Sequence, residues 1–393
     1  MLAVITLFSW LIALIWIWRS LVAIRNLPRL PNLLGEEFDN GSEASALPQI
    51  SVIVPARNEE QAIEQTLRSL LSQQGITIEI LAVNDRSTDK TGQIMECVAA
   101  EGRARGKSIG VIHIEDLPSG WMGKTHAMAL AARQASAPWL LFTDGDIFFR
   151  EDCLRRSIAY AEDHTDHLIL FPSLIFKTAG ERMMLSTFQA LSMLFTRPWK
   201  TPDPKSRESF GMGAFNFIRA RVYRSIGGFE AHPMEVLEDV KLGYEVKRHG
   251  FRQHVAVGKG LTYLHWAPGA IGIVRNLTKN IFAVFRFRPA ILLAACLGIA
   301  VFCLIPAFSI FGPWSMRIAG IAAFTGAFST FRSCQRYLNG VSAWYALLVP
   351  VATCLIVYMM LRSMVVTLAR KGVVWRGTFY PLAELRKHAG RLR

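Results

Sequence analysis

Short apolar segments alternate with helix-forming segments between residues 49 and 144, and no other feature constrains the fold as strongly. Runs rich in Val, Ile and Leu predict strands at 49–56, 78–85, 108–114 and 139–144. The segments 59–73, 90–100 and 124–134 predict helices between them. Because such alternation is typical of parallel sheets covered on both faces, we expect an α/β domain.

Polar clusters follow three of the predicted strands. They are "PARNEE" (55–60), "NDRSTD" (84–89) and "DGD" (144–146). Ligands of α/β sheets bind beyond the C-terminal strand ends, so we expect the three clusters to form one site. The first cluster lacks the glycine pattern of a dinucleotide-binding fold, which argues against a nicotinamide or flavin enzyme.

Asp144 and Asp146 stand one residue apart where an apolar strand ends. Their like charges repel each other, and a positive group between them would relieve the repulsion. Mg²⁺ or Mn²⁺ bound to a diphosphate needs one or two carboxylates, because phosphate oxygens fill much of the remaining shell. The motif therefore predicts a metal–diphosphate site, with an ordinary Asp-Gly turn as the alternative.

Other polar residues of this region have both a functional and a structural interpretation. Asp85 can accept hydrogen bonds from a base or ribose, whereas Ser87, Thr88 and Asp89 can equally cap a helix. Lys124 precedes a helix and can meet a phosphate, or it can remain solvated.

Glu238 and Asp239 begin an amphipathic helix predicted within residues 236–250. A carboxylate there can act as a general base toward an acceptor hydroxyl. Helix N-termini also favour acidic residues because of the helix dipole, so a structural role stays open. His265 can contact a metal or a phosphate, although a lone histidine is more often structural.

The ends of the chain are strongly apolar. Residues 2–18 carry no charge and approach the ~20 residues that cross a bilayer. Arg19, Arg25 and Arg29 follow, and no cleavage site is present, so we expect an anchor whose C-terminal side is cytoplasmic rather than a signal peptide. A buried core helix is the alternative.

Three more apolar segments lie near the C-terminus. Residues 290–311 and 342–361 are long enough to span, whereas 318–331 is short and can be a span, a re-entrant piece or an interfacial helix. The tail is basic, with Arg362, Arg370, Lys371, Arg376, Arg386, Lys387, Arg391 and Arg393 against only Glu384. A cytoplasmic tail requires an even number of crossings after residue 290, so we expect 318–331 not to cross fully.

The composition supports a membrane protein. The 393 residues are 51% hydrophobic, with a mean hydropathy of +0.27 and a formal net charge of +14. Apolar and basic character together suit anionic lipid surfaces. No nucleic-acid recognition motif accompanies the charge. The six cysteines lack metal-type spacing, and the few spans lack the intramembrane charges of a transporter.

The ordered motifs "SVIVPARNEE", "VNDRSTDKT", "GWMGKTHAM", "FTDGD", "GAFNFIRARVYRSIGGFE" and "LEDVKLGYEVKRHG" resemble glycosyltransferase family 2 over about residues 49–285. The flanking apolar segments and the ending "VVWRGTFYPLAEL" look most like its membrane-bound branch, which includes ceramide glucosyltransferase and carotenoid- and hopanoid-associated enzymes. The resemblance implies a GT-A catalytic domain with a Rossmann-like mixed sheet, one N-terminal and two to three C-terminal transmembrane helices.

The resemblance also implies a role for each matching position. Nucleotide-sugar contacts would come from Pro55, Arg57, Glu59, Asp85, Lys124 and Asp144. Asp146, with Asp144, would hold Mg²⁺ or Mn²⁺ on the diphosphate. Asp239 would be the catalytic base with Glu238 beside it, and Gly213, Ala214 and Phe215 would form the acceptor-side loop. Attack by a base-activated hydroxyl inverts the anomeric centre.

Two departures from the family pattern narrow the prediction. Asn84-Asp85 stands where many members have Asp-Asp, so the nucleoside contact can differ in detail. No Gln-x-x-Arg-Trp motif follows Asp239, and processive polymer synthases carry that motif to hold a growing chain. We therefore expect a single transfer to a small acceptor.

A lipid is the expected acceptor. Residues 181–199 and 271–287 mix apolar and basic side chains, so both can lie on the membrane surface or simply pack against neighbouring helices. The adaptable Met183, Met184 and Met193 would suit a lipid.

The predicted organisation is an anchor at 1–20, a linker at 21–48, a GT-A domain with interfacial helices at 49–289, a transmembrane region at 290–363 and a basic cytoplasmic tail at 364–393. The predicted function is transfer of one sugar, from a donor expected to be a UDP-sugar, to a hopanoid, carotenoid or sphingolipid-like alcohol at the cytoplasmic face of the cell membrane. The alternatives are a polyprenyl-phosphate glycosyltransferase and a non-catalytic nucleotide-sugar-binding scaffold. The sequence leaves the sugar and the oligomeric state open.

Overall fold

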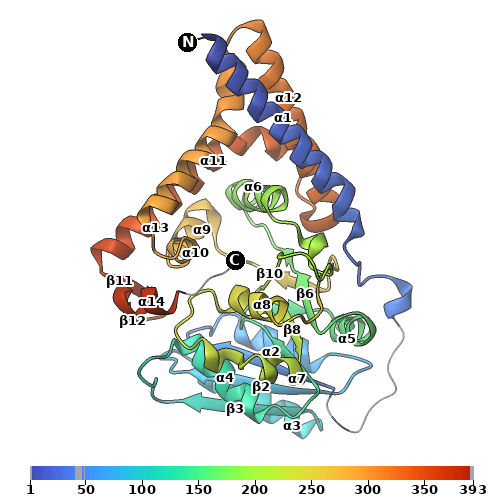
Figure 1. The fold of residues 1–393 in the computed structure, drawn as a ribbon. Helices are drawn as coiled ribbons and strands as arrows, with labels where there is room; N and C mark the ends of the chain where they lie inside the picture. Colours follow the sequence, from blue (N-terminus) through green and yellow to red (C-terminus); the bar gives the residue numbers. More distant parts are fainter. Residues whose placement is uncertain (1, 40–46, 48, 390–393) are drawn as a thin grey trace.

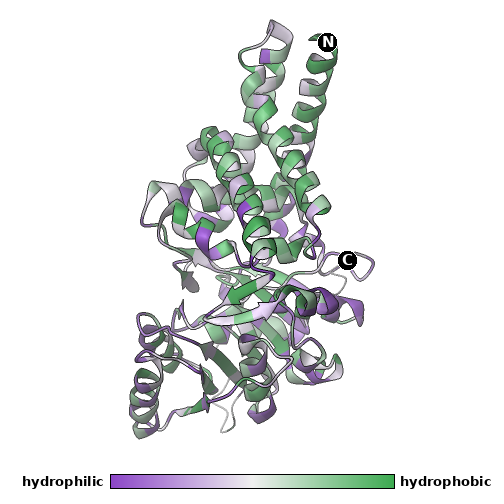
Figure 2. Cartoon of the chain, turned by 90° about the vertical axis from the view of Figure 1, so that its left-hand side faces the viewer, coloured by the Kyte–Doolittle hydropathy of each residue, from purple (hydrophilic) through white to green (hydrophobic). Residues whose placement is uncertain are grey.

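The computed structural model describes residues 2–39, 47 and 49–389. Figure 1 shows three parts within them: an N-terminal helix, an α/β domain, and C-terminal helices that end in a small hairpin. The long helices form an arch above the α/β domain. Figure 2 shows that hydrophobic residues dominate the arch, whereas hydrophilic residues are frequent on the α/β domain.

A seven-stranded sheet in the order β3-β2-β1-β4-β8-β6-β9 forms the centre of the α/β domain. Its strands are β1 (Ile50–Ala56), β2 (Ile78–Asp85), β3 (Ser108–Ile114), β4 (Trp139–Phe142), β6 (His167–Phe171), β8 (Asn216–Arg219) and β9 (Gln253–Val257). The first four are parallel, as the alternation predicts, but β8 is antiparallel to both β4 and β6. The sheet is therefore mixed, as the family resemblance implied and the periodicity alone did not.

Helices cover both faces of this sheet. One face carries α2 (Ile63–Leu71), α3 (Thr91–Ala104) and α5 (Cys153–His164), and the other carries α4 (Gly123–Gln134), α7 (Ala220–Ser225) and α8 (Glu238–Arg248). Val52 and Val54 of β1 pack with the first group, and Ile53 packs with the second. Because successive strand side chains point to opposite faces, a strand covered on both sides is apolar along its whole length.

A small second sheet follows the DGD motif. It consists of β5 (Ile147–Phe149), β10 (Thr262–Leu264) and β7 (Ser173–Leu174), in that order. Residues predicted as part of a linker also join the domain, because the N–H of Leu33 donates to the carbonyl of Val257 and the N–H of Val257 to the carbonyl of Pro31, both at 2.8 Å.

The arch consists of α1 (Leu2–Asn26), α11 (Pro289–Ser309), α12 (Trp314–Cys334), the 3₁₀ helix η6 (Ala343–Leu348) and α13 (Val349–Ala369). Among the described residues, three stretches are long and apolar enough to cross a membrane: Leu2–Arg29, Pro289–Ser309 and Ala343–Ala369. Helix α12 has 21 residues and extends beyond the apolar run at 318–331 on both sides. It continues through Arg317 and Arg332, which lie near its two ends.

Short helices lie beneath the arch, at the positions where interfacial segments were predicted. They are α6 (Ala179–Phe195), α9 (Gly269–Leu277) and α10 (Ile281–Val284). Met184 and Met193 of α6 are buried in the core that the arch and these helices share, so both have a packing role.

The predicted basic tail folds into β11 (Gly372–Trp375), β12 (Thr378–Pro381) and α14 (Leu382–His388). Strands β11 and β12 form an antiparallel hairpin. Arg391 and Arg393 lie outside the described residues.

Candidate active site

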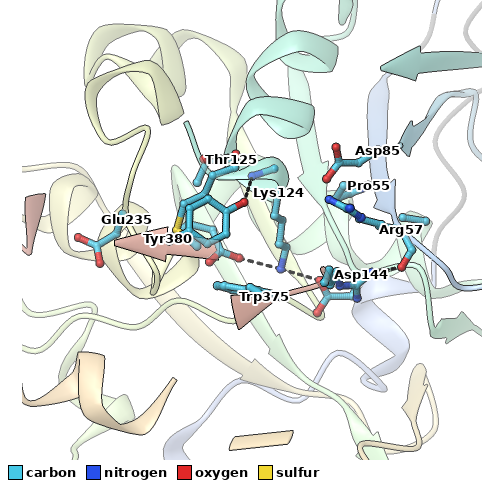
Figure 3. Close-up of a pocket in the computed structure, with 14 residues that line it drawn as sticks. Pro55, Arg57, Asp85, Lys124, Thr125, Asp144, Glu235, Trp375 and Tyr380 are labelled. Carbon is cyan, nitrogen blue, oxygen red and sulfur yellow. Dashed lines mark hydrogen bonds and ion pairs between the residues drawn. The ribbon is translucent and has the colours of Figure 1, made fainter. Parts of the chain in front are cut away.

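The C-terminal ends of β1, β2 and β4 meet at one edge of the sheet, because β1 pairs with both of the others. They bring Arg57, Asp85 and Asp144 to the wall of one cavity (Figure 3). Asn58 and Arg86, next to two of these residues, each have a φ of 56°. Residues other than glycine rarely adopt this conformation, and it occurs often at functional sites.

Ser87, Thr88 and Asp89 connect the loops that follow β1 and β2. Ser87 Oγ accepts a hydrogen bond from the N–H of Asn58 (3.1 Å), and the N–H of Thr88 donates to Asn58 Oδ1 (2.8 Å). Asp89 Oδ1 accepts from the N–H of Thr91 at the start of α3 (3.0 Å). The bond of Asp89 lies at the start of α3, whereas those of Ser87 and Thr88 join the two loops of the site and cap no helix.

Lys124 lies in the first turn of α4 and contacts two carboxylates. Its Nζ is 2.6 Å from Asp144 Oδ1 and 2.7 Å from Glu238 Oε1. Burial would lower the pKa of Lys124, but the charges of the two carboxylates outweigh burial and raise that pKa above its ordinary value. The lysine is therefore charged at neutral pH. Its two ion pairs join the end of β4 to α8 across the cavity, and Figure 3 shows the one with Asp144.

The two aspartates of the DGD motif differ in their surroundings. Burial, and then the charges of Asp144 and Glu59, raise the pKa of Asp146 to about 7. Burial acts on Asp144 in the same direction, but Lys124 holds the pKa of Asp144 below its ordinary value. The carboxylate of Asp146 has no hydrogen bond or ion pair with the described residues, so a divalent cation would relieve its repulsion from Asp144.

The carboxylates of Asp144 and Asp146 thus suit a divalent metal ion whose remaining ligands come from a bound substrate. No group of three or more His, Cys, Asp or Glu side chains within the described part of the chain is placed to hold a metal. Two carboxylates would therefore need oxygens from a diphosphate and from water, which is the usual arrangement for Mg²⁺.

Glu238 and Asp239 begin α8, as predicted from sequence. Glu238 is buried and lines the cavity, and burial, more than the charges nearby, raises its pKa to about 7. Asp239 is half-buried, does not line this cavity, and accepts a hydrogen bond from the N–H of Val240 (2.8 Å). Gly211 has to be glycine, because a Cβ there would collide with the backbone of Asp239. This close approach fixes the start of α8 beside the site.

Of the predicted acceptor-side residues, Gly213 lies beside the ion pairs. A Cβ on Gly213 would be 2.8 Å from Asp144 Oδ2 and 3.1 Å from Lys124 Nζ, so glycine lets the chain pass close to both. Ala214 and Phe215 are buried. An acceptor role for this loop stays a prediction.

The C-terminal hairpin supplies a wall that sequence reasoning missed. Trp375, Arg376 and Tyr380 line the cavity. The hydroxyl of Tyr380 accepts a hydrogen bond from the N–H of Gly123 (3.0 Å), and Arg376 forms an ion pair with Glu59. More than 300 positions separate Arg376 from Glu59, so no local pattern indicates the contact. The sequence signal for the hairpin was the ending "VVWRGTFYPLAEL", which resembles the membrane-bound branch of the family.

Six of the predicted site residues line the cavity: Pro55, Arg57, Asp85, Lys124, Asp144 and Glu238. About 30 Å³ of space remains between its side chains, whereas ligand pockets typically have roughly 300–1,000 Å³. A nucleotide-sugar therefore requires side chains to move. Arg86 does not line the cavity but pairs with Asp85, which does, at 2.7 Å. His265 does not line the cavity and lies 3.4 Å from Glu181, which favours a structural role.

The mixed sheet, covered by helices on both faces, has the GT-A fold of glycosyltransferases. The mannosyltransferase PcManGT from Pyrobaculum calidifontis, solved with GDP-Man and Mn²⁺, has a similar fold. The TM-score is 0.52 at 16% identity, covering 92% of this chain and 98% of that one.

Residues 51–227 match glycosyl transferase family 2. The chain carries a domain of this family and is a glycosyltransferase. Among similar relatives is the 4,4'-diaponeurosporenoate glycosyltransferase of Staphylococcus haemolyticus (strain JCSC1435), 23% identical over 62% of this chain and 73% of the relative. The enzyme of the same name from Staphylococcus aureus (strain MRSA252) is 27% identical over 49% of this chain and 50% of the relative.

Proposed function

We propose that the protein transfers one sugar from a nucleoside-diphosphate sugar to a membrane lipid, with inversion at the anomeric carbon. The observation that carries this proposal is the acidic cluster at the strand ends and the start of α8, in which Lys124 bridges Asp144 and Glu238 while Asp146 pairs with none of the described residues. Such a cluster suits a substrate that brings both a divalent cation and phosphate oxygens.

The nucleoside and the diphosphate of the donor would each meet a suitable group in the site. Arg57 and Asp85 at the ends of β1 and β2 would contact the nucleoside, and Pro55 lies beside them in the lining. Asp144 and Asp146 would hold Mg²⁺ or Mn²⁺ on the diphosphate, where the ion stabilises the leaving group as a Lewis acid. A UDP-sugar remains the expected donor.

Asp239 would take the proton of the acceptor hydroxyl. As it does so, the acceptor oxygen forms a bond to the anomeric carbon, and the bond from that carbon to the diphosphate breaks on the opposite face. Glu238 and Lys124 would keep α8 aligned with the donor through their ion pair (2.7 Å).

The acceptor would be an apolar lipid that enters beneath the arch. Helices α6, α9 and α10 lie between the α/β domain and the long helices, where a lipid would approach the site (Figure 1). The relatives named after diaponeurosporenoate support a carotenoid or a similar terpenoid.

The contacts at the helix ends support a particular membrane topology. Ser9 of α1 and Ser309 of α11 lie 2.9 Å apart (Oγ to Oγ), and Trp10 Nε1 donates to Ser315 Oγ of α12 (3.0 Å), so these three helices meet far from the α/β domain. At the opposite end of α12, Asn339 Nδ2 donates to Gln189 of α6. We infer that α12 accompanies α1 and α11 through the membrane, although its composition does not place it among the candidate spans of the described residues and the expectation for residues 318–331 is not overturned.

The segment Ala343–Ala369 then has both ends on the catalytic side. It packs along α12, where Trp344 contacts Phe328 (ring centroids 5.1 Å apart), and returns along α11, where Met360 Sδ lies 3.9 Å from Cys296 Sγ. A re-entrant path for this segment leaves two crossings after residue 290. The basic tail and the catalytic domain would therefore both be cytoplasmic, as the positive-inside rule requires.

The proposed activity can be tested by nucleotide release from the detergent-purified protein. UDP-, GDP- and dTDP-sugars would be offered with Mn²⁺ or Mg²⁺ and a membrane lipid extract. We expect metal-dependent release from one donor, lost in Asp146→Ala and Asp239→Asn and retained in Asp163→Asn, which changes an exposed carboxylate of α5. Nucleotide binding without release from any donor would instead favour a non-catalytic scaffold.

A further inference from the structure

A second cavity, of about 220 Å³, lies next to the active site. Its walls come from α9 and the link to α10, from the C-terminal end of α13, and from β11. Arg275, Lys279, Arg362 and Arg370 line it, and no acidic side chain does so among the described residues.

These four cations lack a direct ion pair, although the charges of Asp144 and Glu238 act on Lys279. None forms an ion pair with a residue that the structure describes. Arg362 donates to Thr278 Oγ1, and Lys279 Nζ lies 4.9 Å above the ring of Trp375. By contrast, the buried Lys241 pairs with Glu245 at 2.7 Å. Four like charges around one cavity repel each other, and an anion bound between them would relieve that repulsion.

Basic residues at the cytoplasmic end of a membrane helix are common, and orientation alone explains Arg362 and Arg370 on α13. It does not explain why Arg275 and Lys279, from a different element, line the same cavity. Convergence of cations from separate segments on an enclosed space is typical of an anion site.

The cavity opens beside apolar surface. Ile271 of α9, Val365 of α13 and Val374 of β11 are 54%, 58% and 44% exposed. An anion carried on an apolar chain would satisfy both kinds of surface, with its charge among the arginines and its chain against these side chains.

The cavity also adjoins the donor pocket through β11. Val373 and Val374 line the basic cavity, and Trp375, the next residue along the strand, lines the active site. Because Lys279 contacts Trp375, a group held in the basic cavity lies one side chain away from the donor pocket.

We propose that this cavity binds one phosphate or carboxylate group carried on an apolar chain, which is the head group of an anionic lipid. The proposal deepens the proposed function, since an anionic acceptor would be held here with its chain toward the membrane. The same chemistry could come from an anionic phospholipid of the bilayer, and the experiment separates the two sources.

Binding can be measured without catalysis. Thermal unfolding of the delipidated protein in a non-ionic detergent would be followed by tryptophan fluorescence with dioctanoyl phosphatidylglycerol, dodecyl phosphate or dioctanoyl phosphatidylcholine. We expect the two anionic probes to raise the unfolding temperature and the zwitterionic probe not to do so. Arg362→Gln with Arg370→Gln should weaken binding of the anionic probes at least about tenfold, because hydrogen bonds between charged groups are the strong ones.

Two matched double variants control for fold and overall charge. Arg25→Gln with Arg29→Gln removes the same charge from exposed positions, one in the last turn of α1 and one just after that helix, and it should bind like the wild type. Arg362→Lys with Arg370→Lys keeps the charge and should restore most of the binding. Nucleotide binding should be unchanged in all three variants, which shows that they fold.

Transfer assays in nanodiscs would show whether the anion belongs to the acceptor or to a phospholipid of the bilayer. If the acceptor carries the anion, sugar goes only to the acidic fraction of the lipid extract, and added phosphatidylglycerol competes. If the bilayer supplies it, the neutral fraction accepts sugar and phosphatidylglycerol stimulates transfer. The proposal is overturned if anionic probes stabilise no more than phosphatidylcholine, or equally in the glutamine variant of the cavity. Stabilisation without transfer from any donor would contradict only the proposed function.

Discussion

The active-site cavity and the basic cavity share the β11 wall, but their charges are arranged in opposite ways. In the active site most charged groups have a partner: Lys124 with Asp144 and Glu238, and Arg86 with Asp85. The four cations of the basic cavity have none among the described residues. The first site is therefore internally compensated and nearly filled, and the second is uncompensated and open.

This difference indicates how each site would meet its ligand. The proposed donor would meet charged groups that already pair with each other in the active site. In the basic cavity an anion adds a missing charge without displacing anything. We expect substitutions in the active site to change the chemical step strongly, and those in the basic cavity to change lipid binding and, through it, transfer.

The largest effect should follow from Asp239→Asn. Without a base, kcat should fall about 10²- to 10⁴-fold while donor KM stays nearly constant. Steady-state kinetics of nucleotide release would measure both values. The comparison variant is Glu238→Gln, which keeps Asp239. If Glu238→Gln abolished transfer and Asp239→Asn did not, the buried Glu238 would be the base.

Lys124→Met tests whether the pairing of charges in the active site matters for activity. Asp144 and Glu238 would lose their common cation, so donor kcat/KM should fall roughly 10- to 100-fold. The unfolding free energy should fall by about 3–5 kcal/mol, the typical cost of leaving a buried charge unpaired. Lys241→Met breaks another buried Lys–Glu pair, on α8, and should reduce stability without the loss in kcat/KM. Equal kinetic losses in both variants would contradict a specific role for Lys124.

Gly213→Ala should have a smaller effect. The new Cβ would press on Asp144 and Lys124 and shift the pair, so kcat should fall roughly tenfold. Gly110→Ala on β3 is the control, because the nearest atom to its new Cβ is 4.0 Å away. Kinetics and thermal unfolding of both variants would show whether the loss is local. Unchanged kinetics in Gly213→Ala would mean that the pair tolerates displacement.

The smallest effect concerns pH in the basic cavity. Burial, and then the charges of Arg376 and Lys124, lower the pKa of Lys279 to about 8, although Asp144 and Glu238 act in the opposite direction. Lys279 is therefore charged below this pH and becomes neutral above it, so affinity for an anionic probe should fall a few-fold between pH 7 and pH 9. Lys279→Arg should remove this dependence, because arginine stays charged. The thermal-shift titration measures both, and an equal fall in the two proteins would exclude Lys279 as its source.

Several parts of the molecule followed directly from the sequence. The first four strands and the helices between them lie where the alternation of short apolar runs and helix-forming segments placed them, because strands buried on both faces are apolar along their length. The strand-end position of Asp85 and Asp144 followed from the same patterns together with the topology of parallel sheets. The long apolar runs indicated α1 and α11 because the bilayer sets a minimum length.

Only the tertiary structure revealed the features that are built from residues far apart in the sequence. The pairing of Lys124 with Glu238, the contact of Arg376 with Glu59 and the antiparallel β8 join residues that no local period relates. The length of α12 was hidden because arginines near its ends interrupt the apolar run while the helix continues through them. The basic cavity is the clearest case, since Arg275 and Arg362 are unremarkable in sequence and acquire a possible role only where α9 and α13 meet.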